Sequence, residues 1–310
     1  MATAEGVSVV VPHYGPAERT LAIVAALRAQ EVDLPLQLVV VDDSSPHRFP
    51  ITDGIEVVRR PRNGGYGAAV NTGASTARYD RLLVVNSDLH VGPTFIGDLV
   101  EAAAPWWPAV VGPRLIRPDG ASEWGARHFP RAGHHVVEWL TPLARWRDHR
   151  RLHEAVGHDT RAVAGEVLPV DWVVGAALLL PTELFRAVGG FDEQYFMYSE
   201  EVDLQRRLRE RGVPSIFAGT VTAAHAGGAS SDPTARRQWV VDSRFRFADL
   251  WGGRRRLAAG LTVATAVNAV VNSARRVAGR DVRPLVTARE ELRLIRHGAG
   301  QVTQDRSGPR

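Results

Sequence analysis

The 310-residue sequence contains no cysteine and no lysine. The lack of cysteine excludes disulfides, thiolate metal sites and thiol nucleophiles, and it is compatible with a reducing compartment. All 38 basic side chains are therefore arginines, and with 34 acidic residues they leave a net charge of only +4 at a sequence pI near 10.0. Because arginine alone accounts for that pI, the value is poor support for nucleic-acid binding.

The positive charge is concentrated at the C-terminal end. Residues 251–310 carry twelve arginines and four carboxylates, a net charge of +8, whereas residues 1–250 carry a net charge of −4. Basic residues interleaved with aromatic residues would favour nucleic-acid binding. The tail arginines instead flank an apolar segment. We therefore expect no nucleic-acid partner.

Long hydrophobic runs are also scarce. The longest uncharged stretch, Leu257–Ala274, is interrupted by Gly260, Asn268 and Asn272, and a spanning helix needs about 20 predominantly apolar residues. Met1 to Gly6 lacks the basic residues of a secretory signal. We expect no signal peptide and at most a marginal membrane span.

The first 115 residues alternate short apolar runs with amphipathic segments, which predicts an α/β fold with a parallel sheet covered on both faces. Expected strands are 7–11, 36–41, 55–58, 82–85 and 109–112, and expected helices are 17–30, 67–77 and 93–104. Polar clusters at 12–14, 42–45 and 86–88 follow three of these strands. Because ligands bind beyond the carboxyl ends of such strands, the clusters should line one crevice.

Residues 117–170 show no clear period, and then a strand is expected near 170–180, helices at 182–188 and 199–211, and a strand at 214–217. We expect one domain over residues 1–250, with a first half at about 6–115 and a second half at about 116–250. Residues 251–310 should form a basic helical extension.

Two polar groups in the first half suggest ligands. Asn86-Ser87-Asp88 offers oxygen atoms for a divalent cation, although the same residues are typical of an ordinary turn at a strand end. The loop Asn63-Gly64-Gly65-Tyr66-Gly67, followed by Asn71, resembles a backbone loop that approaches a phosphate or sugar, and a structural turn explains it equally well.

Two groups in the second half suggest catalysis. Ser199-Glu200-Glu201-Val202-Asp203 places carboxylates at a helix start, where one of them would serve as a general base. Helix capping and dipole stabilisation explain the same acids without any chemistry. His225 follows a strand and precedes a glycine-rich turn, and a lone histidine of this kind is more often structural than a ligand.

In this order, the motifs resemble those of family 2 glycosyltransferases, which are inverting, nucleotide-sugar-dependent enzymes of the GT-A fold. The resemblance covers about residues 6–250 and is most specific in Val170–Gly175 and Gly189–Leu204. Within this family, the motifs most resemble those of rhamnosyltransferases that use dTDP-rhamnose and act on polyprenyl-diphosphate-linked sugars in cell-wall assembly. A GT-A fold implies a Rossmann-like nucleotide-binding sheet, the nucleotide-sugar half at about 6–115, fused to an acceptor-binding and catalytic half at about 116–250.

The resemblance also implies roles for individual residues. Nucleotide-sugar binding falls to Pro12, Tyr14, Asp42, Asp43, Asn63, Gly65, Asn71 and Asp88. Asp88 and His225 would hold Mg²⁺ or Mn²⁺, and Glu201 would be the catalytic base, with Glu200 as its rival. Acceptor binding is expected at Trp172, Gly175, Asp192 and Tyr198.

Two departures from the family pattern leave alternatives open. Asn86 replaces the first acid of the Asp-x-Asp motif, and the base pair reads Glu-Glu where Glu-Asp is commoner. The alternatives are a UDP-sugar or GDP-mannose donor, or a nucleotide-sugar or glycan-binding protein without catalysis.

The C-terminal extension has two readings. Arginines flank 257–274, and Thr265, Asn268 and Asn272 share one helical face. This pattern fits an interfacial helix that brings the enzyme to a lipid-linked acceptor, through residues 251–296, and equally a helix packed on the catalytic domain. The expected location is cytoplasmic, peripheral on the inner face of the cell membrane.

Overall fold

The structure is a computed structural model and describes residues 4–146, 149–225 and 233–301. The chain forms two compact units, Met1–Phe129 with His158–Ser231, and Pro130–Gly157 with Asp232–Arg310. This division differs from the expected one at residue 250, because the segment 130–157 and helix α8 (Pro233–Trp251) belong to the second unit. The glycine-rich turn after His225 lies outside the described residues.

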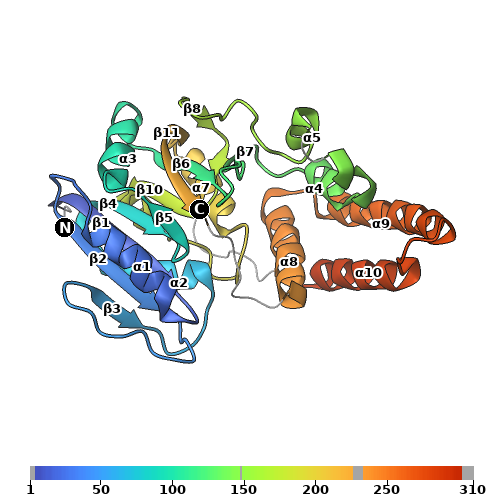
Figure 1. Cartoon of the computed structure of the whole chain (residues 1–310), viewed down its shortest axis with the longest axis horizontal. Helices are drawn as coiled ribbons and strands as arrows, with labels where there is room; N and C mark the ends of the chain where they lie inside the picture. The colour runs from blue at the N-terminus through green and yellow to red at the C-terminus, as the bar shows by residue number, and fades with distance from the viewer. Residues whose placement is uncertain (1–3, 147–148, 226–232, 302–310) are drawn as a thin grey trace. The chain divides into compact units, whose positions relative to one another are not determined.

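The first unit is built on a nine-stranded sheet in the order β3-β2-β1-β4-β10-β6-β11-β5, with β8 beside β11 (Figure 1). The strands are β1 (Ala4–His13), β2 (Leu36–Asp42), β3 (Glu56–Arg59), β4 (Tyr79–Val85), β5 (Leu89–Val91), β6 (Val110–Ile116), β8 (Val167–Val170), β10 (Ala177–Pro181) and β11 (Ser215–His225). A separate pair joins β7 (Ala126–Arg127) to β9 (Trp172–Val173).

The sheet is mixed and not wholly parallel. Strands β1, β2, β3 and β4 pair in parallel, as predicted, and so do β6 and β11. Strand β10 is antiparallel between β4 and β6, and β5 and β8 are antiparallel to β11. The reason is that the chain enters β10 beside the end of β4, where the Asn86 amide donates to the Ala176 carbonyl over 2.8 Å.

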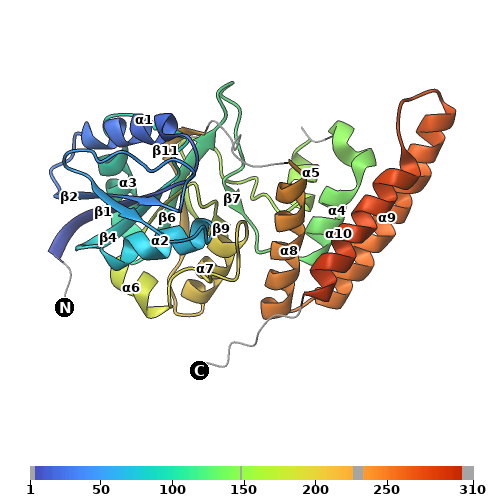
Figure 2. The same ribbon diagram turned by 90° about the horizontal axis from the view of Figure 1, so that it is seen from below.

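Helices cover both faces of this sheet, as Figure 2 shows. One face packs on α1 (Ala17–Arg28) and α3 (Phe95–Ala103), and the other on α2 (Tyr66–Ser75), α6 (Thr182–Ala187) and α7 (Glu200–Arg209). The short 3-10 helix η1 (Ala104–Trp106) follows α3. Alternate strand residues such as Val9 and Val10 enter opposite cores, so the continuous valine runs are explained by burial on both faces.

The second unit is helical. It contains α4 (Ala132–Trp139), η2 (Thr141–Trp146), α5 (Arg150–Ala155), α8, α9 (Arg254–Val277) and α10 (Pro284–Gly300). Helices α9 and α10 run side by side. Its core is formed by Val241, Phe245, Ala248, Leu257, Leu261, Leu294 and Ile295.

The polar side of α9 faces into this unit. The Trp139 indole donates to the Thr265 hydroxyl over 2.9 Å, and the Asn268 amide binds the backbone of Trp139 and Thr141 over 2.9 and 3.0 Å. Helix α9 is thus packed by its polar stripe, while Val263, Val267 and Val270 on the other side are 63, 42 and 71 % exposed. By length and composition α9 also passes as a membrane span, the one such helix among the described residues.

Candidate functional site

The predicted crevice lies where β1, β2 and β4 end. His13 and Asp42 are paired in register, and the Asp43 amide donates to the His13 carbonyl over 2.9 Å. His13 itself is buried and its Nδ1 lies 2.7 Å from the Thr20 hydroxyl, whereas Tyr14 is 47 % exposed beside the half-buried Pro12. Tyr14 is therefore available to a ligand at this edge.

Asp42 and Asp43 shape the loops of the crevice. The Asp42 carboxylate accepts the Ser45 and Phe49 amides over 2.7 and 3.0 Å and pairs with Arg59. Burial alone would raise the pKa of Asp42, but these hydrogen bonds bring it below its usual value. Both aspartates are nearly fully buried, so their role in this structure is to order the loops that follow these strands.

The glycine loop is held by Asp43. Its carboxylate accepts the Gly64 and Gly65 amides over 3.1 and 2.9 Å and pairs with Arg60, and the Asn63 side chain also accepts from Gly65. Gly65 has φ 86°, and a Cβ there would collide with the Phe196 carbonyl. Glycine is thus required where this loop meets the chain that leads to α7.

Asn71, on α2, also holds a turn through hydrogen bonds to main-chain groups. Its side-chain amide donates to the Phe191 carbonyl over 2.9 Å and accepts the Phe191 amide over 2.8 Å. Both polar ends of Asn71 therefore hold the Gly190–Phe191 turn.

Asp88 and His225 come together although 137 positions separate them in the sequence. Asp88 follows β4, and His225 is the last residue of β11, with its Nε2 3.2 Å from the Asp88 Oδ1. The Nδ1 of His225 lies 2.7 Å from Glu123 Oε2. The hydrogen bonds to Asp88 and Glu123 raise the pKa of His225 to about 10.

These side chains suit a divalent cation. Adjacent ligands of an octahedral Mg²⁺ lie about 3 Å apart, which is close to the Asp88–His225 separation of 3.2 Å. Asn86 Oδ1 is buried and has no hydrogen-bond partner among the described residues, so an oxygen donor is also unused at this strand end. Asp88, His225 and Asn86 are thus the residues that fit a metal.

The two glutamates begin α7 after a strained turn. Tyr198 and Ser199 have φ 73° and 64°, a left-handed conformation that is uncommon for residues other than glycine and clusters at functional sites. Glu200 is buried and Glu201 is half-buried, and for each the Oε2 atom is buried without a hydrogen-bond partner in the described part of the chain. Two carboxyl oxygens are therefore unsatisfied at one point.

The surroundings distinguish these two carboxyl groups. Burial raises the pKa of Glu201, and the main-chain amides of Gly175 and Ser199 and the charge of Arg127 act against that rise. Burial and the neighbouring Glu201 raise the pKa of Glu200 well above its ordinary value. Groups that favour the ionised form therefore surround Glu201. Glu201 also lies against Gly175, because a Cβ added to Gly175 would be 3.2 Å from the Glu201 Cβ.

Tyr66 links the metal-side and glutamate-side residues. Its hydroxyl donates to the Gly175 carbonyl over 2.5 Å. Burial and then the charges of Glu200, Glu201 and Asp88 raise its pKa well above 10. The ends of β4, α2 and α7 therefore meet in one acidic site.

The remaining acceptor candidates differ in position. Trp172 is only 8 % exposed, with its indole donating to the His128 carbonyl over 3.0 Å, so it supports the site from within. Gly175 lies next to Glu201 in space, and Tyr198 precedes Glu201 by three positions in the sequence. Asp192 is half-buried and accepts the Gln194 amide over 3.1 Å in the turn before α7.

Sequence patterns missed a segment that contributes to the site. Glu123 contacts His225, and Arg127 lies near Glu201 with its guanidinium 5.6 Å from the Trp172 ring centre. Between them Trp124 has φ 54°. This segment has no periodic pattern, so only a search for isolated acids and aromatics in the aperiodic region would have found it.

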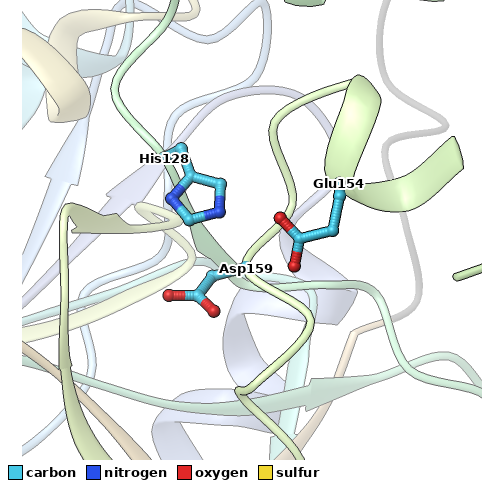
Figure 3. A group of neighbouring side chains, drawn as sticks. All are labelled: His128, Glu154 and Asp159. Carbon is cyan, nitrogen blue, oxygen red and sulfur yellow. The ribbon is translucent and has the colours of Figure 1, made fainter. Parts of the chain in front are cut away.

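Figure 3 shows three further titratable side chains, those of His128, Glu154 and Asp159. The Asp159 carboxylate is bound by Arg161 over 2.9 and 2.6 Å. Because Arg161 already neutralises Asp159, this group is a weaker candidate for a cation than Asp88 and His225.

Comparison with known proteins identifies relatives of the first unit and part of the second. Residues 8–160 match the family described as Glycosyl transferase family 2. The N-acetylglucosaminyl-diphospho-decaprenol L-rhamnosyltransferase of Mycobacterium tuberculosis is 31 % identical over 252 residues, which cover 73 % of this chain and 78 % of the relative. The pre-mycofactocin glycosyltransferase of the same species is 28 % identical over 77 % of this chain and 45 % of its own.

A solved structure supports the fold. The mannosyltransferase PcManGT from Pyrobaculum calidifontis, in complex with GDP-Man and Mn²⁺, matches with a TM-score of 0.55 at 17 % identity. The match covers 96 % of this chain and 86 % of that one. The predicted GT-A fold is therefore confirmed, with helices following the α/β unit.

Proposed function

Because the chain belongs to glycosyl transferase family 2, we propose that it transfers L-rhamnose from dTDP-rhamnose to a hydroxyl of a polyprenyl-diphosphate-linked sugar, with inversion at the transferred carbon. The transferred sugar and the acceptor are taken from the 31 % identical mycobacterial relative, whose name specifies L-rhamnose and a decaprenol-linked acceptor. The dTDP carrier is taken from the resemblance of the sequence motifs. The proposal implies a role in cell-wall or polysaccharide assembly.

The observation that supports catalysis best is the unsatisfied Oε2 of Glu201. A buried carboxyl oxygen without a donor is unfavourable in a purely structural role. An acceptor hydroxyl would supply the missing donor and would place its proton on the atom that is to receive it.

The proposed reaction is a single displacement. The acceptor oxygen forms a bond to the anomeric carbon while the bond from that carbon to the diphosphate oxygen breaks, and the electron pair leaves with the diphosphate. Glu201 takes the acceptor proton. Burial and the neighbouring Glu201 raise the pKa of Glu200, which lies buried inside the protein beside the base.

Asp88, His225 and Asn86 would hold Mg²⁺ or Mn²⁺. The cation, when bound, would stabilise the charge that gathers on the leaving diphosphate. Tyr14 and the Asp43-ordered loop would face the nucleotide, since they lie at the same strand ends.

A donor screen tests this function. The full chain is incubated with an N-acetylglucosaminyl-diphospho-polyprenol and dTDP-rhamnose, UDP-sugars or GDP-mannose, each with Mg²⁺ or Mn²⁺. We expect the highest kcat/KM with dTDP-rhamnose and an inverted anomeric configuration by NMR. Faster turnover of another donor would assign a different sugar, and retention of configuration would exclude single displacement.

A lipid-linked acceptor requires the enzyme to reach a membrane, and the exposed side of α9 offers a surface for this. Val263, Val267 and Val270 project from one side of the helix and are 63, 42 and 71 % exposed. Residues 250–280 contain no acidic residue, and Arg255, Arg256, Arg275 and Arg276 are exposed near the two ends of α9. We propose that this side lies on an anionic lipid surface as a peripheral contact on the cytoplasmic face, with α9 parallel to it.

Vesicle binding tests the α9 surface. Replacing both Val263 and Val270 by Asp should weaken binding to phosphatidylglycerol vesicles by at least about 10-fold, because two apolar contacts are lost and two negative charges face the lipid. Val163→Asp is the matched control, since Val163 is 50 % exposed in the first unit. A concentration-dependent dimer that the double variant abolishes, without vesicle binding by the unmodified chain, would show that a second copy covers this face.

A further inference from the structure

We propose that Glu123 is a positioning residue that orients His225 to bind a divalent cation through Nε2. This inference rests on the proposed function, because it concerns the same metal. Glu123 lies in the aperiodic segment before β7 and contacts His225 from 102 positions away in the sequence.

The geometry defines the two ring nitrogens of His225. Nδ1 lies 2.7 Å from Glu123 Oε2, a short charge-assisted hydrogen bond, and Nε2 lies 3.2 Å from Asp88 Oδ1. The side chains of Glu123 and His225 are 21 and 18 % exposed, so little water competes for this contact. With Nδ1 engaged by Glu123, only Nε2 faces the Asp88 carboxylate.

A neutral histidine binds a metal through the nitrogen that carries no proton, and an acceptor at the other nitrogen fixes which one that is. Glu123 accepts the Nδ1 proton, which leaves Nε2 as the ring nitrogen that a cation beside Asp88 would bind. Asn86 replaces an acid at this strand end, and a well-oriented, carboxylate-supported imidazole compensates for the missing negative ligand. Glu123 itself does not touch the ion.

The backbone around Glu123 is also fixed. The Glu123 amide donates to the Leu115 carbonyl over 3.1 Å, and Leu115 pairs with Ala223 between β6 and β11. Trp124, the next residue, has φ 54°, which turns the chain toward β7. The carboxylate is thus presented from a segment tied to the strand that carries His225.

Metal affinity tests the proposal in the full chain. Mn²⁺ binding is measured by calorimetry for the unmodified chain, Glu123→Ala and Glu123→Gln. We expect Glu123→Ala to weaken the affinity by about 10- to 100-fold, the usual effect of removing such a partner. Glu123→Gln should restore most of it, since the amide oxygen still accepts from Nδ1. Nitrogen-15 NMR with Mg²⁺ should show a proton on Nδ1 of His225 in the unmodified chain and a mixture of tautomers in Glu123→Ala.

Three outcomes would overturn the proposal. These are unchanged Mn²⁺ affinity in Glu123→Ala, equal losses in the Ala and Gln variants, or no Mn²⁺ binding by the unmodified chain. Thermal unfolding of each variant separates misfolding from misorientation, and Asp119→Ala, a change at an exposed acid, serves as the control. Failure here with full transfer in the donor screen would leave the proposed function standing without Glu123.

Discussion

Glu201→Gln is expected to lower the rate of sugar transfer by about 10³-fold, because the amide keeps the shape of the side chain and cannot accept the acceptor proton. Affinity for the donor should stay within about threefold, since the glutamine still receives the Gly175 and Ser199 amides that act on Glu201. Single-turnover transfer and donor titration measure the two quantities separately.

The neighbouring glutamate provides the matched control. Glu200→Gln should retain transfer within about tenfold of the unmodified chain, because Glu200 is buried beside the base and does not take the proton. The reverse order, with Glu200→Gln inactive and Glu201→Gln active, would assign the base to Glu200. Full activity in both variants would exclude the pair from catalysis.

The pH profile supplies a second readout of Glu201. Burial raises its pKa, so the base becomes protonated, and activity is lost, as the pH falls through a value above the ordinary range of a carboxyl group. The residual activity of Glu201→Gln should lack this acidic limb. An identical limb in the variant would show that another group limits the reaction at low pH.

Asp88→Asn is expected to lower metal-dependent transfer by about 10²-fold or more, because it removes the negative charge beside His225 while keeping the side-chain volume. Burial alone would raise the pKa of Asp88, but the hydrogen bond and charge of His225 hold it below its usual value. The carboxylate therefore stays ionised at working pH and should not contribute the acidic limb.

Chelation by EDTA should abolish transfer by the unmodified chain, and Mn²⁺ or Mg²⁺ should restore it. Asp119→Asn, at an exposed acid paired only loosely with Arg117 over 3.4 Å, should behave like the unmodified chain. Equal activity of Asp88→Asn and Asp119→Asn at saturating donor would remove Asp88 from the metal site.

The strand ends were the most predictable part of the site. Apolar runs closed by Pro12, Asp42 and Asn86 determine where a parallel sheet must end, so the crevice follows from local pattern. The position of Glu201 at the start of a charged helix was predictable for the same reason. What pattern could not reveal was that Asp42 and Asn71, the right residue types for ligands, are engaged by main-chain groups of loops.

The contribution of Glu123 and the orientation of α9 depend on tertiary contacts. No local sequence pattern marks Glu123. Its role depends on its contact with His225, which lies more than a hundred positions later in the sequence. Helix α9 was predictable as amphipathic, but its polar stripe packs inward because Trp139 and Thr141 satisfy Asn268 and Thr265. Hydrophobic periodicity identifies a polar and an apolar face of a helix, but it cannot specify which face a tryptophan distant in the sequence will cover.

The second unit is built from two segments that are separated in the sequence, residues 130–157 and 232–310, and this has a consequence for synthesis on the ribosome. Trp139 of α4 is made 126 residues before its hydrogen-bond partner Thr265, which at about 5–20 residues per second is a delay of roughly 6–25 s. During that interval the first unit gains its last strands, β8 to β11, while α4 still lacks the helix on which its tryptophan packs. A nascent chain stalled after β11 should therefore hold a folded α/β unit and an exposed α4, which makes this helix a natural point of attack for proteases and of capture by chaperones.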